Sequence, residues 1–229
     1  VAIIYKGEMV VDIWGGHREM ERTSEWQSDT IVNVWSTTKT MMFLTLLTLA
    51  DRGEISLTDP VHKYWPEFKV NGKEGIEIRH LMAHTAGLSG WAEPMTSDDL
   101  FNHDKCAAVL GAQAPWWTPG SQSGYHAITQ GYLIGEVVKR VTGQSLGNFF
   151  RENFAEPLGA DFHIGTAPEH HHRITNVIPG VSLLDSTAQP DSIAVRTYTN
   201  PMLAAEIAWT PEWRQCESPA ANGQGNARS

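Results

Sequence analysis

The sequence lacks the features that mark several classes of protein. Only two of its 229 residues are cysteines, Cys106 and Cys216, and they lie far apart without the spacing of metal ligands. This content argues against a disulfide framework, and two free thiols favour a reducing compartment. We therefore expect a cytoplasmic protein.

Long apolar runs and basic clusters are also missing. A membrane-spanning helix needs about 18 consecutive apolar residues, but the longest candidate run, 41–50, is followed at once by Asp51 and Arg52. The formal net charge is −9 at pH 7, and acidic and basic residues are interspersed. The sequence thus predicts neither a membrane span nor a nucleic-acid-binding surface.

The chain ends carry no recognisable signals. Residues 1–5 are strand-like from the start, without an initiating Met, a basic leader segment or a cleavage site, and residues 223–229 resemble the start of a helix. We therefore expect the chain to be cut at both ends. What is present is a globular composition, with 41% hydrophobic and 19% charged residues and no internal repeat.

Apolar patterning predicts a mixed α/β protein. Two β-like runs at the N-terminus, 1–5 and 9–14, indicate a hairpin. A third run, 31–35, leads into a helix that begins near Ser36 and ends before Gly53; because this helix is apolar on nearly every side, we expect it to be buried. The other segments with helical patterns are 76–84, 98–111, 128–141 and 145–154.

The order of these segments suggests three parts. Residues 1–52 would form the N-terminal part of an α/β sheet domain together with the long helix, and residues 53–160 a helical domain. Residues 161–229 are rich in proline and weakly periodic. We expect them to form an irregular surface excursion, or a wall on the substrate side, that leads toward missing C-terminal strands of the sheet domain.

Ser36 and Lys39 form the pattern S-x-x-K at the head of the long helix. Residues three apart on a helix have Cβ atoms about 5–6 Å apart, so the hydroxyl and the amine can meet. Lys39 can take the proton of Ser36 if desolvation lowers its pKa from about 10.4 toward neutrality. The helix N-terminus also offers N–H groups to an oxyanion. The alternative is a serine that only caps the helix, beside a solvated lysine.

Three segments in order resemble a known family. STTK at residues 36–39, LMAHTAGL at 81–88, and Pro-Gly at 119–120 followed by Tyr125 resemble the serine β-lactamase-like hydrolases, most closely the family VIII carboxylesterases and their class C β-lactamase relatives. The resemblance covers nearly all of residues 1–160. It implies a β-lactamase/transpeptidase-like α+β fold, with an antiparallel sheet flanked by helices and an added helical domain.

The resemblance also implies roles for three residues. Ser36 matches the acylated nucleophile, Lys39 the lysine that shares or removes its proton, and Tyr125 the tyrosine that relays protons to the leaving group and activates water. Such a tyrosine needs a nearby cation to lower its pKa from about 10; otherwise Tyr125 is a core aromatic. We expect a hydrolase of small-molecule carboxylic esters that uses an acyl-enzyme and no cofactor or metal.

Two departures from the family pattern keep other functions open. Tyr125 is followed by His126 and Ala127 where class C β-lactamases have Tyr-x-Asn, which favours simple esters; we expect His126 to face solvent. The third family motif is Lys-Thr-Gly, His-x-Gly or Trp-Gly-Gly on a later strand, and we expect it to be absent after Tyr125. The His-Ile-Gly at 163–165 is not on a predicted strand, and the Trp-Gly-Gly at 14–16 ends the first hairpin. The alternatives are a β-lactamase or D-Ala-D-Ala peptidase, and a non-catalytic binding protein or inactive fragment of this fold.

One further serine lies in a hydrolase-like motif. Residues 143–147 spell G-x-S-x-G, but a predicted helix precedes them where a nucleophile elbow requires a strand. We therefore expect Ser145 to cap a helix.

The remaining His and Trp motifs are open to structural explanations. His80 and His84 have i, i+4 spacing without the Glu of H-E-x-x-H, and we expect them to pack around a turn. The His tract at 170–172 is expected in a solvated loop. Trp116 and Trp117 either wall an acyl pocket or fill the core.

Overall fold

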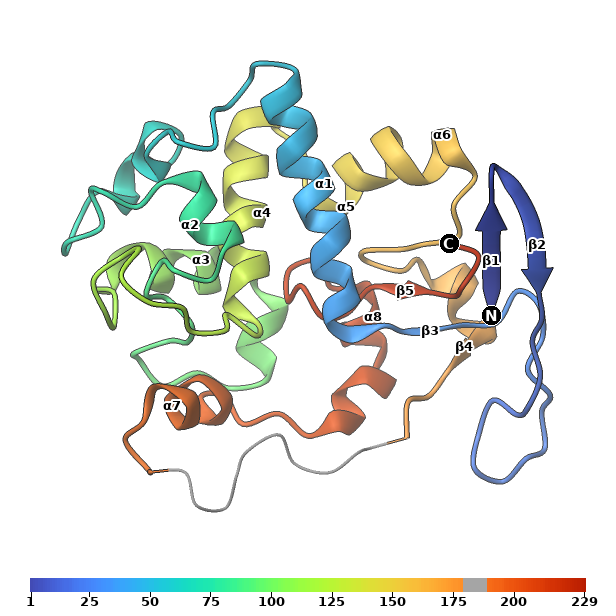
Figure 1. Ribbon diagram of the computed structural model, residues 1–229. Helices are drawn as coiled ribbons and strands as arrows, with labels where there is room; N and C mark the ends of the chain where they lie inside the picture. Colours follow the sequence, from blue (N-terminus) through green and yellow to red (C-terminus); the bar gives the residue numbers. More distant parts are fainter. Residues whose placement is uncertain (179–188) are drawn as a thin grey trace.

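The computed structural model describes residues 1–178 and 189–229 (Figure 1). Strand β1 (Ala2–Tyr5) pairs antiparallel with β2 (Glu8–Asp12). Lys6 and Gly7 between them have φ of 51° and 84°, the positive values that a tight hairpin turn requires at both positions. The predicted N-terminal hairpin is therefore confirmed.

A second small sheet lies near the N-terminal end of the long helix. Its central strand β3 (Ile31–Asn33) pairs parallel with β4 (Ile174–Thr175) and antiparallel with β5 (Gln224–Gly225). Residues 218–225 are all buried. The expectations of a surface excursion and of a C-terminal helix start are thus wrong for this segment, because a two-residue strand is too short to show an apolar period.

Helix α1 (Thr38–Asp51) runs through the middle of the molecule and packs against α4 (Thr129–Thr142) and α5 (Leu146–Phe150), as Figure 1 shows. Each predicted helical segment contains a helix or helical turn. The shorter helices are α2 (Ile78–Met82), α3 (His103–Ala112), α6 (Glu156–Leu158), α7 (Ile193–Thr199) and α8 (Pro211–Gln215). None of the helices among the described residues is long and apolar enough to cross a membrane.

The core forms where α1 and α4 meet. Leu46, Leu133 and Trp213 are fully buried there. However, Leu44 and Leu47 are 38% and 45% exposed, so the expectation that α1 is covered on nearly every side is wrong. An all-round apolar run does not indicate which face its neighbours cover.

One further expectation is confirmed by the structure, and another stays untested. Cys106 and Cys216 are free thiols, as predicted. The division into 1–52, 53–160 and 161–229 stays a prediction, and the contacts of α1 with α4 and α5 cross the first of these boundaries.

Candidate active site

Ser36 lies in a tight turn between β3 and α1. The turn, Trp35–Thr37, is a 3-10 helix, and Trp35 has φ of 48°, a conformation that costs a bulky residue about 1–3 kcal/mol. Thr38 holds the turn, because its hydroxyl donates to the Trp35 carbonyl at 2.6 Å and accepts from the Gly223 N–H at 3.0 Å. The N-cap of α1 is Thr37, so Ser36 is not the capping residue.

Lys39 points back toward this turn from the first turn of α1. Its Nζ is 3.2 Å from Ser36 Oγ and donates to the carbonyls of Ala127 at 2.7 Å and Ala220 at 3.1 Å. A neutral amine has two N–H groups and one lone pair. With both N–H groups on carbonyls, the lone pair is left for the hydroxyl proton of Ser36.

The surroundings of Lys39 favour that neutral form. The side chain is only 4% exposed, so the alternative of a solvated lysine does not hold. Burial penalises the charged ammonium and lowers the pKa of Lys39 from 10.5 to about 7. A large share of the Lys39 amines is therefore neutral near physiological pH.

Tyr125 lies beside the same amine. Lys39 Nζ is 5.2 Å from the centre of the Tyr125 ring, and Tyr125 is 42% exposed. A core aromatic would be covered, so this alternative is not supported. The structure thus brings Ser36, Lys39 and Tyr125 together on one partly open surface.

His84 is a neighbour of this group that the sequence interpretation did not assign to it. Its ring packs against Tyr125 with centres 4.6 Å apart, and its Nδ1 accepts from the His126 N–H at 3.1 Å. Burial, followed by the charge of Lys39, lowers the pKa of His84 to about 4. The ring is neutral at pH 7 and supports the aromatic face of Tyr125. In the sequence, a place for His84 near the site is indicated by its position within the family-like segment 81–88.

His126 is fully buried, so the expectation that it faces solvent is wrong. Its Nδ1 donates to the Gly124 carbonyl at 2.6 Å and its Nε2 accepts from the Leu88 N–H at 3.2 Å. Burial lowers the pKa of His126 to about 3. The ring therefore ties the Tyr125 segment to the segment at Leu88, and it carries no charge with which to bind substrate.

The two tryptophans differ in environment. Trp117 is 8% exposed and packs edge-on against His126 with ring centres 5.9 Å apart, which favours the core-filling alternative. Trp116 is half-buried, and the Arg196 guanidinium lies 3.9 Å from its ring centre.

The remaining motifs lie in structural roles. Ser145 caps α5 by accepting from the Asn148 N–H at 3.3 Å, as predicted. His80 Nδ1 accepts from the Glu77 N–H at 3.1 Å in the capping box of α2, which supports a structural role for His80; the packing of both histidines around a turn stays a prediction. The His tract belongs to the 3-10 helix Pro168–Arg173, where His170 and His171 are partly buried and His172 is exposed, so the expectation of a loop is wrong.

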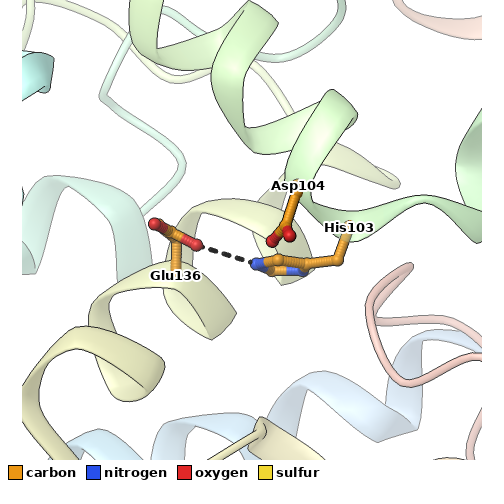
Figure 2. Close-up of side chains that lie close together, drawn as sticks. All are labelled: His103, Asp104 and Glu136. Carbon is orange, nitrogen blue, oxygen red and sulfur yellow. Dashed lines mark hydrogen bonds and ion pairs between the residues drawn. The ribbon is translucent and has the colours of Figure 1, made fainter. Parts of the chain in front are cut away.

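A separate cluster joins α3 and α4. Among the described residues, His103, Asp104 and Glu136 are the one group of three potential metal ligands within 4.8 Å of one another (Figure 2). His103 Nε2 and Arg140 Nε each contact Glu136, at 3.1 and 2.6 Å, and Lys139 contacts Asp104 at 2.7 Å. Each carboxylate is thus already paired, which indicates an ion-pair network between the helices.

Comparison with known proteins identifies the relatives of the chain. The family model described as Beta-lactamase matches residues 1–229. The esterase/beta-lactamase LipL of Mycobacterium tuberculosis is 34% identical over 240 residues, covering 100% of this chain and 56% of the relative. Esterase EstB of Burkholderia gladioli is 31% identical over 177 residues, covering 69% of this chain and 45% of the relative.

Solved structures agree with these relatives. A family VIII carboxylesterase matches with a TM-score of 0.89 and 41% identity, covering 97% of this chain and 59% of the other. A penicillin-binding protein homolog from Caulobacter crescentus matches with a TM-score of 0.87 and 35% identity, covering 98% and 60%. The predicted fold is confirmed, and the chain spans about half the length of the curated relatives it matches. By sequence and by fold, the chain belongs to the beta-lactamase family.

Proposed function

We propose that this chain carries the nucleophile of a serine hydrolase that cleaves small-molecule carboxylic esters through an acyl-enzyme on Ser36. The observation that carries the proposal is a buried amine of lowered pKa, Lys39, whose Nζ lies 3.2 Å from Ser36 Oγ. A serine hydroxyl becomes a good nucleophile only when such a base takes its proton.

In the proposed reaction, Ser36 Oγ attacks the ester carbonyl carbon while its proton passes to Lys39 Nζ. The tetrahedral intermediate collapses with cleavage of the carbon–oxygen bond, and Tyr125 relays the proton from Lys39 to the departing alcohol. Water then attacks the acyl-enzyme while Tyr125 takes a proton from the water and passes its own proton to the neutral Lys39 amine. The bond to Ser36 Oγ breaks, Ser36 regains the proton from Lys39, and the acid leaves. The backbone N–H at Ser36 is the candidate donor to the oxyanion at the start of the helix.

Two observations favour simple esters. Ala127 offers Lys39 its carbonyl but has no side-chain amide to bind an acylamino group. EstB is named an esterase and the structural neighbour a carboxylesterase. The name of LipL includes both activities, so a β-lactamase or D-Ala-D-Ala peptidase is the second candidate.

Substrate comparison tests the preference for esters. In the whole protein that contains this chain, we expect kcat/KM for p-nitrophenyl butyrate to exceed that for nitrocefin by about tenfold or more, because a site without the amide loses about one hydrogen bond to the acylamino group. Comparable values for the two substrates would favour the β-lactamase alternative. Absence of both turnover and labelling of Ser36 by a fluorophosphonate would favour the binding protein.

Tyr125→Phe tests the proton relay. The substitution removes one hydroxyl and keeps the ring that packs on His84. We expect kcat for p-nitrophenyl butyrate to fall by about 10²- to 10⁴-fold, the usual contribution of a positioned acid or base, with an unchanged melting temperature. Burst and steady-state phases report acylation and deacylation separately. Turnover at the wild-type rate would remove Tyr125 from the mechanism.

A further inference from the structure

The carbonyl of Ala220 is part of the Lys39 environment although it lies 181 residues away in sequence. Ala220 is fully buried and has φ of 56°, a left-handed conformation that is unfavourable for a residue with a Cβ. Such a conformation persists only where the surroundings hold it. The position of this carbonyl therefore depends on what fixes the segment 216–222.

On one side, this segment is pressed against α4. A Cβ added to Gly131 would lie 1.8 Å from the Ser218 carbonyl oxygen and 2.6 Å from the Ala220 nitrogen. Only glycine permits this approach. The contact limits movement toward α4 but supplies no hydrogen bond that holds the segment in place.

On the other side, the segment has side-chain ties at Glu217, Ser218 and Ala221: Glu217 Oε2 accepts from the Gly147 N–H of α5 at 2.7 Å, Asn33 Nδ2 donates to the Ala221 carbonyl at 3.1 Å, and Ser218 bonds His103 of α3. Ser218 Oγ lies 2.8 Å from His103 Nδ1, and His103 Nε2 lies 3.1 Å from Glu136 Oε2. Figure 2 shows the His103 ring pointing from α3 to Glu136 on α4. The His103 ring also stacks on Tyr132, with centres 5.9 Å apart. Ser218 is 7% exposed, so its hydroxyl depends on this partner.

The charge of Glu136 sets the direction of these bonds. Burial pushes its pKa upward, but hydrogen bonds from His103 and Arg140 outweigh burial and hold the pKa at about 2. The ionised carboxylate only accepts, so His103 Nε2 carries a proton and donates. In the neutral ring, Nδ1 is then the acceptor for the hydroxyl of Ser218. The surrounding charged groups are Asp104 on α3, Lys139 and Arg140 on α4, and Glu217 on the segment itself.

Between the ties at Glu217 and Ala221, the Ser218 part of the segment has room to move once its bond to His103 is lost. A cavity of 350 Å³ adjoins it and is lined in part by His103, Glu217 and Ser218. Displacement of Ser218 toward the cavity would carry Ala220 away from Lys39. Lys39 would lose an acceptor for one of its N–H groups and would gain contact with water.

We propose that His103 and Ser218 are positioning residues, which hold the Ala220 carbonyl on Lys39 and thereby set the rate and the pH dependence of Ser36 acylation. The proposal rests on the function proposed above for Ser36 and Lys39. Ser218, His103 and Glu136 are also the residue types of a Ser-His-Glu catalytic triad. In this proposal, however, Ser218 is not acylated and acts only through the backbone carbonyl of Ala220, two residues later.

A matched pair of substitutions tests the hydroxyl. Thr and Val have the same shape, so Ser218→Thr and Ser218→Val crowd the site equally, but only Thr keeps a hydroxyl for His103. In the whole protein, the rate constant for Ser36 labelling by a fluorophosphonate is measured from pH 5 to 10. Mass spectrometry identifies the labelled residue.

We expect Ser218→Val to label about ten- to a hundredfold more slowly than Ser218→Thr at pH 7. The midpoint of its rise with pH should move above that of Ser218→Thr, because a more hydrated Lys39 has a higher pKa. Asp104→Asn is the control: it removes an ion pair of the same cluster that does not touch the segment, and its rate and midpoint should equal those of the wild type.

The outcomes separate the two proposals. If the wild type labels Ser36 and the Thr and Val variants share one rate and one midpoint, the positioning role is wrong and the proposed function stands. If the wild type never labels Ser36, the proposed function fails first. If the Val variant does not fold, Ser218→Ala, which removes only the hydroxyl, is compared with the wild type by the same two readouts. Labelling found at Ser218 would overturn the positioning role in favour of a second nucleophile.

Discussion

Replacing Ser36 by Ala is expected to lower kcat for p-nitrophenyl butyrate by about 10⁶-fold, the loss seen when the nucleophile of a serine hydrolase is removed. The reason is that no other hydroxyl in the described part of the chain lies within hydrogen-bonding distance of Lys39 Nζ. The melting temperature should change little, since Ser36 is not the N-cap of α1. Steady-state turnover and fluorophosphonate labelling provide the measurement.

Ser145→Ala is the matched control for this substitution. Ser145 lies in the only other sequence motif that resembles a hydrolase nucleophile, and in the structure it caps α5. Loss of the cap should cost about 1 kcal/mol of stability and leave ester turnover unchanged. If Ser145→Ala abolished turnover with the fold intact and Ser36→Ala did not, the nucleophile assignment would be wrong.

The second large effect concerns Lys39 and pH. Because Lys39 takes a proton only when neutral, and burial lowers its pKa to about 7, the rate of Ser36 labelling should rise about tenfold per pH unit below pH 7 and level off above it. Lys39→Met should remove this rise and slow labelling by about 10²- to 10⁴-fold. The measurement is the labelling rate constant as a function of pH.

Lys73 offers a control of the same physical kind. It is a fully buried lysine that donates to the carbonyls of Val70 at 3.0 Å and Gln113 at 2.5 Å, and burial lowers its pKa. Lys73→Met also leaves two carbonyls without a donor, but it should keep the labelling rate and its pH profile. An equal effect of both substitutions would mean that Lys39 acts through stability alone.

Short-range patterns predicted the centre of this site because its residues are close in sequence. Ser36 and Lys39 are three apart, and the change from a β-like run to an apolar run places both at the start of α1. Tyr125 was predicted as a site residue because it belongs to one of three family motifs that occur in the expected order. These predictions concern side chains whose chemistry is visible in their identity.

Other parts of the site have no such signature. The acceptors of Lys39 are backbone carbonyls of two alanines, Ala127 and Ala220, and any residue offers a carbonyl. The burial of His126 depends on contacts with Gly124 and Leu88, one of them 38 residues away. Likewise, β5 consists of only two residues, Gln224 and Gly225. Its strand conformation depends on pairing with β3 more than on the strand propensity of these two residues.

The distant carbonyl of Ala220 also has a consequence for the order of synthesis. Ser36 and Lys39 leave the ribosome long before Ala220, which is 181 residues after Lys39, and long-range contacts form late in folding. Until the segment around Ala220 docks, Lys39 lacks part of the burial that lowers its pKa to about 7, and its pKa lies nearer the ordinary 10.5. In the proposed reaction, Ser36 of the nascent chain is therefore unreactive until the segment 216–222 has docked on Lys39.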